Sequence, residues 1–196
     1  MPGAAPENAA SERGAPEHAL LLRDFVNTLD LDEATDELSD TASLVTWLSA
    51  RGLIAHGSRG VGDGAGEADL EAAIALRTSL RSAMRAHHET RGQPAGLDAA
   101  AGGFPLRVSE SSGTPTLVPA ETGVRGALGW LAAAIVASAA DHTWERLKIC
   151  ADDTCQWAFL DSSKNRSKHW CSMRECGNRA KTRAYRARRA GRGPDR

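Results

Sequence analysis

Four cysteines lie close together in the second half of the chain, at Cys150, Cys155, Cys171 and Cys176. Their pattern, C-x4-C-x15-C-x4-C, consists of two close pairs separated by a longer loop. Each pair can supply two thiolates from one turn, and four thiolates complete a tetrahedron around zinc that leaves no position open for water. The spacing therefore predicts one structural Zn²⁺ ion. Two disulfides, or four ordinary buried thiols, are the alternatives.

A basic segment, GNRAKTRAYRARRAGRG, follows the last cysteine and predicts a helix that glycines terminate. Like charges on so short a helix repel one another, and no acidic residue offsets them after Glu175 within the helix. The phosphates of a nucleic acid would supply the missing counter-charge, although a solvated basic face is the alternative. A narrow face able to pack on the metal module consists of Ala180, Ala184 and Ala187. The candidate nucleic-acid contacts are Arg166, Lys168, Arg174, Asn178, Arg179, Lys181, Arg183, Arg186, Arg188 and Arg189.

The distribution of charge supports a polyanionic partner for this end of the chain. The net charge of the whole protein is only −1. Residues 1–145 nevertheless hold ten arginines against twenty acidic residues, whereas residues 146–196 hold fourteen basic residues against five acidic ones. Such asymmetry is typical of a protein whose basic end binds a polyanion. Mutual neutralisation of the two parts within the fold is the alternative.

The spacer between the two cysteine pairs indicates how the metal site is built. It predicts a strand at 157–160, a polar turn at 161–165 and a return strand that leads to Trp170. Cys176 would then lie in the first turn of the basic helix, which gives a treble-clef-like order of elements. The apolar core that so small a module needs beside its metal would consist of Trp157, Phe159 and Trp170.

The elements before the cysteines predict a larger, mainly helical domain. Its first helix begins near Ala19 in ALLLRDFVNTLD, where apolar residues recur at helical spacing. An acidic loop at 30–37 follows, and then a helix at 42–52 capped by Asp40 or Thr41. A glycine-rich loop at 56–69 leads to a helix at about 67–90, which carries Arg77, Arg81 and Arg85 away from its apolar face. The last elements are a β-hairpin within 104–119 and a helix of about 18 residues from Val124. The expected fold class is α+β, with a mainly helical N-terminal domain and a small β-hairpin, followed by a C-terminal treble-clef-like four-cysteine zinc finger.

Composition indicates the domain boundaries and the compartment. The start of the chain lacks periodicity and is rich in proline and glycine, which predicts disorder. We expect a disordered tail at 1–18, a helical domain at 19–145, a zinc finger at 146–190 and a second disordered tail at 191–196. The first residues do not resemble a signal peptide, and the longest apolar stretch, at 127–140, is too short to span a bilayer. A cytoplasmic protein without a membrane partner is therefore expected.

Other polar clusters provide weaker evidence of chemistry. The carboxylates at 30–37 are closely spaced and more typical of a solvated loop than of a metal site. His87 and His88 fall on a helix where solvent exposure is expected. A nuclease would need a second, open metal site, for which His169 and Asp161 are the nearby candidates, and a lone histidine is more often a surface residue. We therefore expect no enzymatic activity.

Large aromatic residues offer one further site. A pocket for a small-molecule effector would be lined by Phe25, Trp47, Trp130 and Trp144. Ordinary packing in the hydrophobic core is the alternative for all four side chains.

Two stretches carry a resemblance to known families. CSMRECGNRAK, from Cys171, with FLDSSKNR and Trp170 before it, closely resembles the CGNR zinc finger, which is named for the tetrapeptide at 176–179. DFVNTLD, at 24–30, resembles the ABATE domain usually found before that finger. The resemblance implies a bacterial, stress-induced transcription regulator, with four cysteine ligands to zinc, a finger that binds DNA, and an N-terminal domain that senses a signal or mediates association. It also implies that Asn178 braces the turn after the last ligand and that Arg179 faces the nucleic acid.

Two questions about partners stay open at this level. RNA or ribosome binding is an alternative to DNA, because Trp157 and Trp170 could stack on unpaired bases. A homodimer would let two fingers read two half-sites, since one small finger buries little DNA surface.

Overall fold

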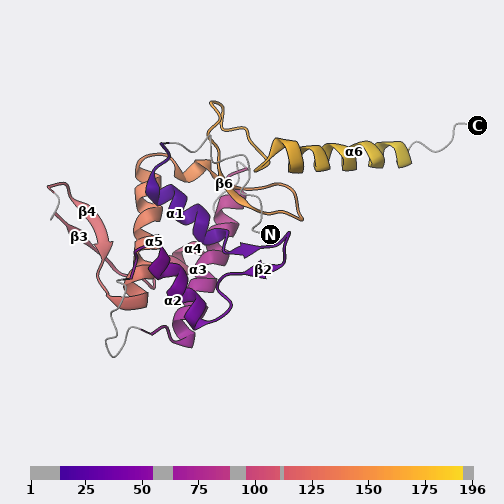
Figure 1. The fold of residues 1–196 in the computed structure, drawn as a ribbon. Coiled ribbons are helices and arrows are strands. Elements are labelled where there is room, and N and C mark those ends of the chain that lie inside the picture. The colour runs from indigo at the N-terminus through magenta and orange to yellow at the C-terminus, as the bar shows by residue number, and fades with distance from the viewer. Residues whose placement is uncertain (1–13, 55–63, 89–95, 111–112, 192–196) are drawn as a thin grey trace, which may run out of the picture.

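The computed structural model describes residues 14–54, 64–88, 96–110 and 113–191 (Figure 1). The helices are α1 (Glu17–Val26), α2 (Thr41–Ala50), α3 (Glu67–Ala86), α4 (Leu97–Ala101), α5 (Gly123–Ala140) and α6 (Asn178–Gly191). Antiparallel pairs are formed by β1 (Leu29–Asp30) with β2 (Thr35–Asp36), β3 (Leu106–Ser109) with β4 (Thr116–Pro119), and β5 (Leu147–Ile149) with β6 (Ala158–Leu160). The expected α+β class is confirmed. Most of both predicted tails, and most of the glycine-rich loop, lie outside the described residues.

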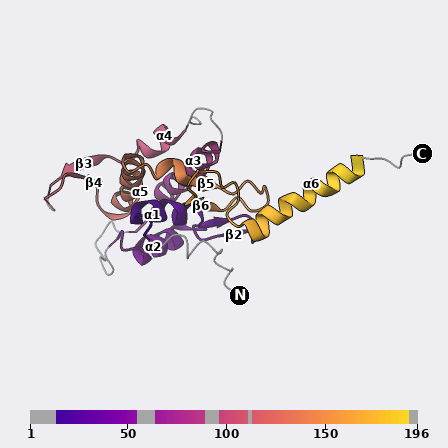
Figure 2. The same ribbon diagram turned by 90° about the horizontal axis from the view of Figure 1, so that it is seen from above.

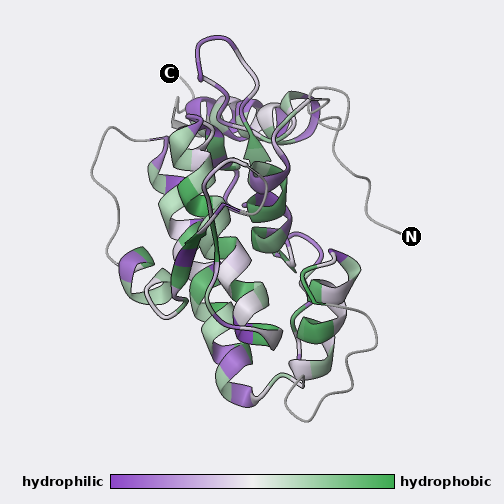
Figure 3. Ribbon diagram, turned by 90° about the vertical axis from the view of Figure 1, so that its left-hand side faces the viewer, coloured by the Kyte–Doolittle hydropathy of each residue, from purple (hydrophilic) through white to green (hydrophobic). Residues whose placement is uncertain are grey.

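Helix α1 begins two residues before the expected start. Pro16 is its N-cap residue, and the Pro16 carbonyl accepts the first helical hydrogen bond, from the Leu20 N–H at 3.2 Å. The apolar stripe of α1 is buried, with Leu22, Phe25 and Val26 fully inside. The hydrophobic segments of the helices run along the centre of the bundle, as Figure 3 shows.

Helix α2 has the cap that its sequence predicts. The Asp40 carboxylate accepts a hydrogen bond from the Ser43 amide at 2.7 Å, which satisfies one of the free N–H groups of the first turn. Gly52 follows the helix in the left-handed region, with φ +68°. The helix buries Trp47 against Phe25 in an edge-on contact with ring centroids 5.3 Å apart.

Helix α5 is the central core helix, and its small residues let neighbours approach closely. A Cβ placed on Gly129 would lie 3.0 Å from the Cβ of Pro119, so glycine allows β4 to lie on the helix. Among the described residues, α5 is the helix whose length and mean hydropathy of 1.4 would suit a membrane span. Its buried share of 56% instead matches the core helix of a folded domain.

The strands of the zinc-finger region complete the same core. Leu147, Ile149, Ala158 and Leu160 are buried with the apolar residues of the helices. β5 pairs with β6 in the register Leu147↔Leu160, so the expected pairing of β6 with a return strand before Trp170 is wrong. The reason lies in the spacer, where Asp161 folds the chain into turns by accepting hydrogen bonds from the Ser163 and Lys168 amides at 2.9 and 3.0 Å.

Polar side chains tie the finger region to the helices. The amide group of Asn27, after α1, donates to the Ala158 carbonyl at 2.9 Å and accepts from the Ala158 N–H at 2.7 Å. The Arg81 guanidinium donates to the carbonyls of Val26, Leu29 and Gln156. Asn27 therefore acts on the free edge of β6 as a further strand would.

His87 and His88, which follow α3, are not solvated, although the sequence predicts that they are. His87 Nδ1 lies 2.7 Å from the Leu147 carbonyl oxygen, and His88 Nε2 lies 2.5 Å from that of Ile149. Burial lowers the pKa of both imidazoles. These residues join the end of α3 to β5 because each imidazole reaches a strand carbonyl that β6 leaves unpaired.

The acidic segment stays largely exposed, as expected, but it forms the short β1–β2 ribbon, and one arginine of α3 is buried against it. Arg77 is buried and binds the Asp36 carboxylate through two hydrogen bonds, at 2.6 and 2.7 Å. Hydrogen bonding from Arg77 lowers the pKa of Asp36. A buried guanidinium requires such a partner, and the ribbon supplies it.

Candidate metal centre

The four cysteine sulfurs converge on one point. They all lie within 4.8 Å of one another, and the Sγ distances from Cys171 to Cys155 and to Cys176 are both 3.7 Å. A tetrahedral zinc ion with Zn–S bonds of 2.3 Å separates its sulfur ligands by about 3.8 Å. All four side chains are buried. The donor set and its spacing therefore fit one structural zinc ion held by Cys150, Cys155, Cys171 and Cys176.

The first pair of ligands is positioned by the turn that connects β5 to β6. The Cys150 N–H donates to the Trp157 carbonyl at 2.8 Å and extends the strand pairing to the metal site. The Cys155 N–H donates to the Asp152 carbonyl at 2.9 Å, which closes a tight turn between the two ligands. Both thiols then project to the same side of the turn.

The second pair is positioned by the start of the C-terminal helix. Cys176 lies in a π-helical turn (Met173–Gly177) that leads into α6, and the Ser172 hydroxyl caps this turn by accepting from the Glu175 N–H at 3.3 Å. The Met173 side chain packs over Gly177, where a Cβ would lie 2.5 Å from the Met173 sulfur. The sequence predicts Cys176 in the first turn of the basic helix, and Cys176 lies in the π-helical turn that leads directly into α6.

Aromatic side chains pack around the cysteine cluster. Phe159 is fully buried among the cysteines, and Trp157 and Trp170 pack against the cluster, as the sequence predicts. His169 stacks on His88 with ring centroids 5.2 Å apart. Neither histidine belongs to the metal cluster.

The thiols interact strongly with one another. The hydrogen bond with Cys155 lowers the pKa of Cys150, and the same contact raises the pKa of Cys155. Thiols that share protons in this way release them when a dication binds, so metal affinity decreases as the pH is lowered. Zinc supplies the positive charge that allows all four sulfurs to be thiolates.

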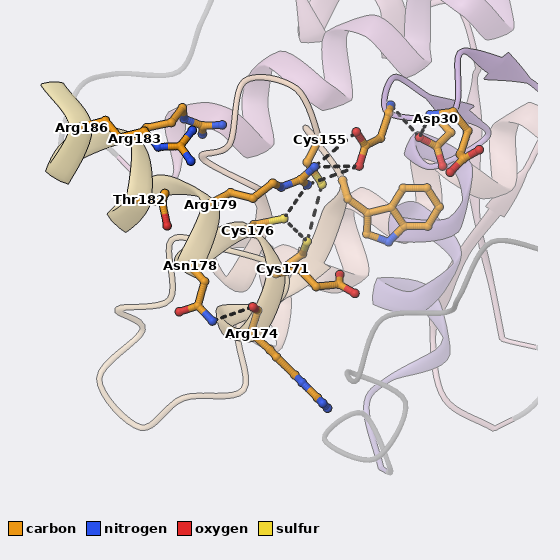
Figure 4. Close-up of a pocket in the computed structure, with 14 residues that line it drawn as sticks. Asp30, Cys155, Cys171, Arg174, Cys176, Asn178, Arg179, Thr182, Arg183 and Arg186 are labelled. Carbon is orange, nitrogen blue, oxygen red and sulfur yellow. Dashed lines mark hydrogen bonds and ion pairs between the residues drawn. The ribbon is translucent and has the colours of Figure 1, made fainter.

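Arg179, which the resemblance assigns to nucleic acid, faces the metal cluster instead (Figure 4). Its Nη2 lies 3.3 Å from the Cys176 sulfur, and its Nε lies 3.1 Å from the Asp152 carboxylate. Arg183 donates to the same carboxylate at 2.9 Å. Asn178 donates to the Arg174 carbonyl at 2.8 Å, which braces the turn after the last ligand.

The rest of α6 projects away from the body (Figures 1 and 2). Side chains 181–189 are all exposed, so the expected packing of Ala184 and Ala187 on the finger is wrong. The helix leaves the body because its apolar residues other than the exposed Tyr185 are alanines, which bury little surface, and the contacts of Arg179 and Arg183 hold only its first turns. Of the other candidate contacts, Arg166 and Lys168 lie on the loop that Asp161 organises.

A cleft of about 840 Å³ separates the root of α6 from the β1–β2 ribbon. Asp30, Asp32 and Glu33 line the ribbon side, and arginines of α6 line the other. The floor includes three of the four cysteines. The metal site therefore lies beneath a cleft with acidic and basic walls.

The four aromatic residues proposed for an effector pocket do not line one pocket, although Phe25 and Trp47 are in contact. Phe25, Trp47 and Trp144 are core side chains, and Trp144 packs edge-on against His87 at 4.9 Å. Trp130 is 40% exposed and lines an apolar groove of about 800 Å³ between α1 and α5. Core packing thus accounts for three of the four.

Sequence reasoning did not single out three polar residues that organise the site. Asp152 lies between the first two ligands and is fully buried, Asp32 reaches Arg179 from the ribbon, and Asn27 fixes β6. Asp152 carried a signal as an acid within a cysteine pair. Asn27 lies in DFVNTLD and Asp32 in the acidic segment 30–37, two stretches that the sequence marks without indicating these contacts.

Comparison with known families agrees with this geometry. The CGNR zinc finger model matches residues 146–189. The ABATE model, described as "Putative stress-induced transcription regulator", matches residues 19–144. No curated protein matches the chain. Because the ABATE match covers well over half of the sequence and the cysteine cluster follows it, the chain belongs to the ABATE family and carries a CGNR zinc finger at its C-terminal end.

Proposed function

We propose that this protein is a zinc-dependent transcription regulator that binds DNA through α6. The observation that carries the proposal is the projecting helix (Figure 1), whose residues 181–189, five basic ones among them, are all exposed. Lys181, Arg186, Arg188 and Arg189 have no ion-pair partner among the residues that the structure describes. Mutual repulsion of these charges is relieved when phosphates approach.

The dimensions of the helix suit a nucleic-acid groove. α6 has 14 residues, which corresponds to a length of about 21 Å, and the DNA major groove of about 12 Å admits one helix. A helix of this length is marginal in water unless a partner stabilises it. The zinc site anchors the first turn, and DNA would stabilise the remainder.

The proposed contacts fall into two groups. Lys181, Arg186, Arg188 and Arg189 on α6 would bind the groove and its phosphates, with Arg166, Lys168, Arg174 and Asn178 of the finger beside them. Arg179 and Arg183 contribute less, because both already bind Asp152.

The N-terminal region is proposed to regulate this binding. The groove beside Trp130 offers an apolar site of the size that small molecules occupy, and it is our candidate for an effector site or a dimer contact. The proposal also includes a cytoplasmic location, a response to stress and no catalytic activity. It is in keeping with the matched families, which are a regulator and a zinc finger rather than enzymes.

The test compares Arg186→Ala with Arg107→Ala, each of which removes one exposed arginine. Affinity of the zinc-loaded protein for duplex DNA is measured as a function of salt concentration. Loss of one phosphate contact makes the negative slope of log K against log salt less steep by about 0.9. We expect this change for Arg186→Ala and not for Arg107→Ala. Arg107 lies on β3, far along the chain from the finger, and serves as the matched control.

Two results would contradict the proposal. Equal slopes for the two variants would remove α6 from the interface. Tighter binding to structured RNA than to duplex DNA at every salt concentration would make RNA the target. Selection of bound sequences from random DNA then identifies the operator.

A further inference from the structure

The arginine of the CGNR tetrapeptide occupies an unusual place for a nucleic-acid contact. Arg179 belongs to the first turn of α6, and its side chain turns back over the metal cluster rather than outward (Figure 4). It is 40% exposed and belongs with Ala180 to the partly buried start of α6, whereas residues 181–189 are exposed. Its guanidinium has partners from three separate parts of the chain.

The first partner is a metal ligand. Arg179 Nη2 donates a hydrogen bond to Cys176 Sγ at 3.3 Å. Four thiolates around a Zn²⁺ ion have a net charge of about −2, so the nearby guanidinium stabilises the charge of the loaded site. A donor to the sulfur also orients the ligand, as outer-shell groups of metal sites do.

The second partner connects the two halves of the metal site. Asp152 lies between Cys150 and Cys155, and its side chain is fully buried. The carboxylate holds the turn by accepting from the Thr154 hydroxyl at 3.0 Å, and its other oxygen lies 3.1 Å from Arg179 Nε. A buried carboxylate requires a positive partner, and Arg179 supplies it together with Arg183.

The third partner comes from the N-terminal region. Asp32, in the β1–β2 ribbon, lies 3.3 Å from Arg179 through its Oδ2 atom. The same ribbon is fixed to α3 by the Asp36–Arg77 pair. Arg179 thus spans the distance between a zinc ligand and the helical part of the protein. Lysine could not make these contacts together, because it presents one point charge instead of a planar fork of donors.

We propose that Arg179 is a positioning residue of the zinc site, which stabilises the Cys176 thiolate and couples metal binding to the docking of the β1–β2 ribbon. The inference concerns the metal site alone and does not depend on the proposed binding of DNA. It assigns Arg179, the arginine of the CGNR motif, a role in the metal site of the protein itself.

The test measures zinc affinity by competition with a chromophoric chelator, with no nucleic acid present. Changes to groups that contact metal ligands typically weaken metal binding by about 10- to 100-fold, and we expect Arg179→Ala to fall in that range. Arg179→Lys should recover part of the loss. Arg186→Ala removes the same side chain from an exposed position of the same helix and should bind zinc as the unmodified protein does.

A spectroscopic measurement separates positioning from a general loss of stability. In the Co²⁺-loaded protein, the thiolate-to-cobalt charge-transfer band reports the hydrogen bonding of the sulfurs. We expect this band to shift in Arg179→Ala and to be unchanged in Arg186→Ala. Zinc affinity within twofold of the unmodified protein, or an unshifted band in Arg179→Ala, overturns the proposal.

The coupling to the ribbon has its own test. Asp32→Asn should weaken zinc binding by up to about fivefold, the effect expected of an exposed ion pair. In the double variant with Arg179→Ala, the Asp32 change should have no further effect, because the shared contact is already lost. Strictly additive losses would show that Asp32 acts independently and would refute the coupling.

Discussion

Asn27 offers the sharpest test of how the finger is joined to the helical region. Its side chain is buried and forms two hydrogen bonds with the main chain of Ala158, which is itself fully buried. Asn27→Ala removes both partners at once. The N–H and C=O groups of Ala158 then lie at the edge of β6 without a hydrogen bond.

The magnitude follows from those two groups. A buried polar group left without its partner costs about 1–3 kcal/mol, so the two together would cost about 2–6 kcal/mol. Partial entry of water reduces this loss, and we expect a fall of about 3 kcal/mol in the free energy of unfolding. In a chain of this length each kcal/mol lowers Tm by about 2–4 °C, which corresponds to about 6–12 °C.

Thermal unfolding of the zinc-loaded protein, followed by circular dichroism at fixed free zinc, measures the effect, since a bound ligand shifts Tm. Asn27→Asp is the isosteric companion, because it keeps the side-chain volume but replaces the donor to the Ala158 carbonyl with an oxygen. Asn165→Ala is the control, since that asparagine is exposed on the loop between the two cysteine pairs. If both Asn27 variants melt within 2 °C of the unmodified protein, Asn27 does not connect the two regions.

Two further predictions concern the metal and acid stability. Removal of zinc by a chelator, or Cys171→Ser, should lower the protection of amides in α1 and α3 from hydrogen exchange, because Leu147 and Leu160 belong to the core that these helices share. Unchanged protection would mean that the helical region is stable without the zinc finger, as expected of a separate domain. Asp36→Asn should lower the stability at pH 7 by about 1–3 kcal/mol, since it weakens an ion pair between a buried guanidinium and a partly exposed carboxylate. The pKa of Asp36 in the folded protein lies below its ordinary value of 3.8, so the stability that ionised Asp36 contributes is complete above pH 3.8 and is lost as pH falls through the folded pKa. Urea unfolding should therefore show a smaller difference in stability between the unmodified protein and Asp36→Asn at pH 3.5 than at pH 7. An equal difference at the two pH values would contradict the role of ionised Asp36.

The sequence by itself determined the features that depend on local spacing. The cysteine pattern, the cap at Asp40, the hairpin within 104–119 and the length of α5 all follow from residue types a few positions apart. Helical periodicity and metal-ligand spacing are properties of neighbouring residues. The family resemblance rests on the same local motifs.

Tertiary structure alone decided where the polar side chains find their partners. Arg179 reaches Asp32 across 147 positions in the chain, Asn27 reaches Ala158 across 131, and β6 pairs with β5 rather than with the segment after it. In the sequence, Arg179 is one basic residue among many on a charged helix. Which carboxylate neutralises an arginine, and which strand edge an asparagine completes, depends on the burial of distant segments around a common core, because a polar group removed from water must find a partner in whatever lies beside it.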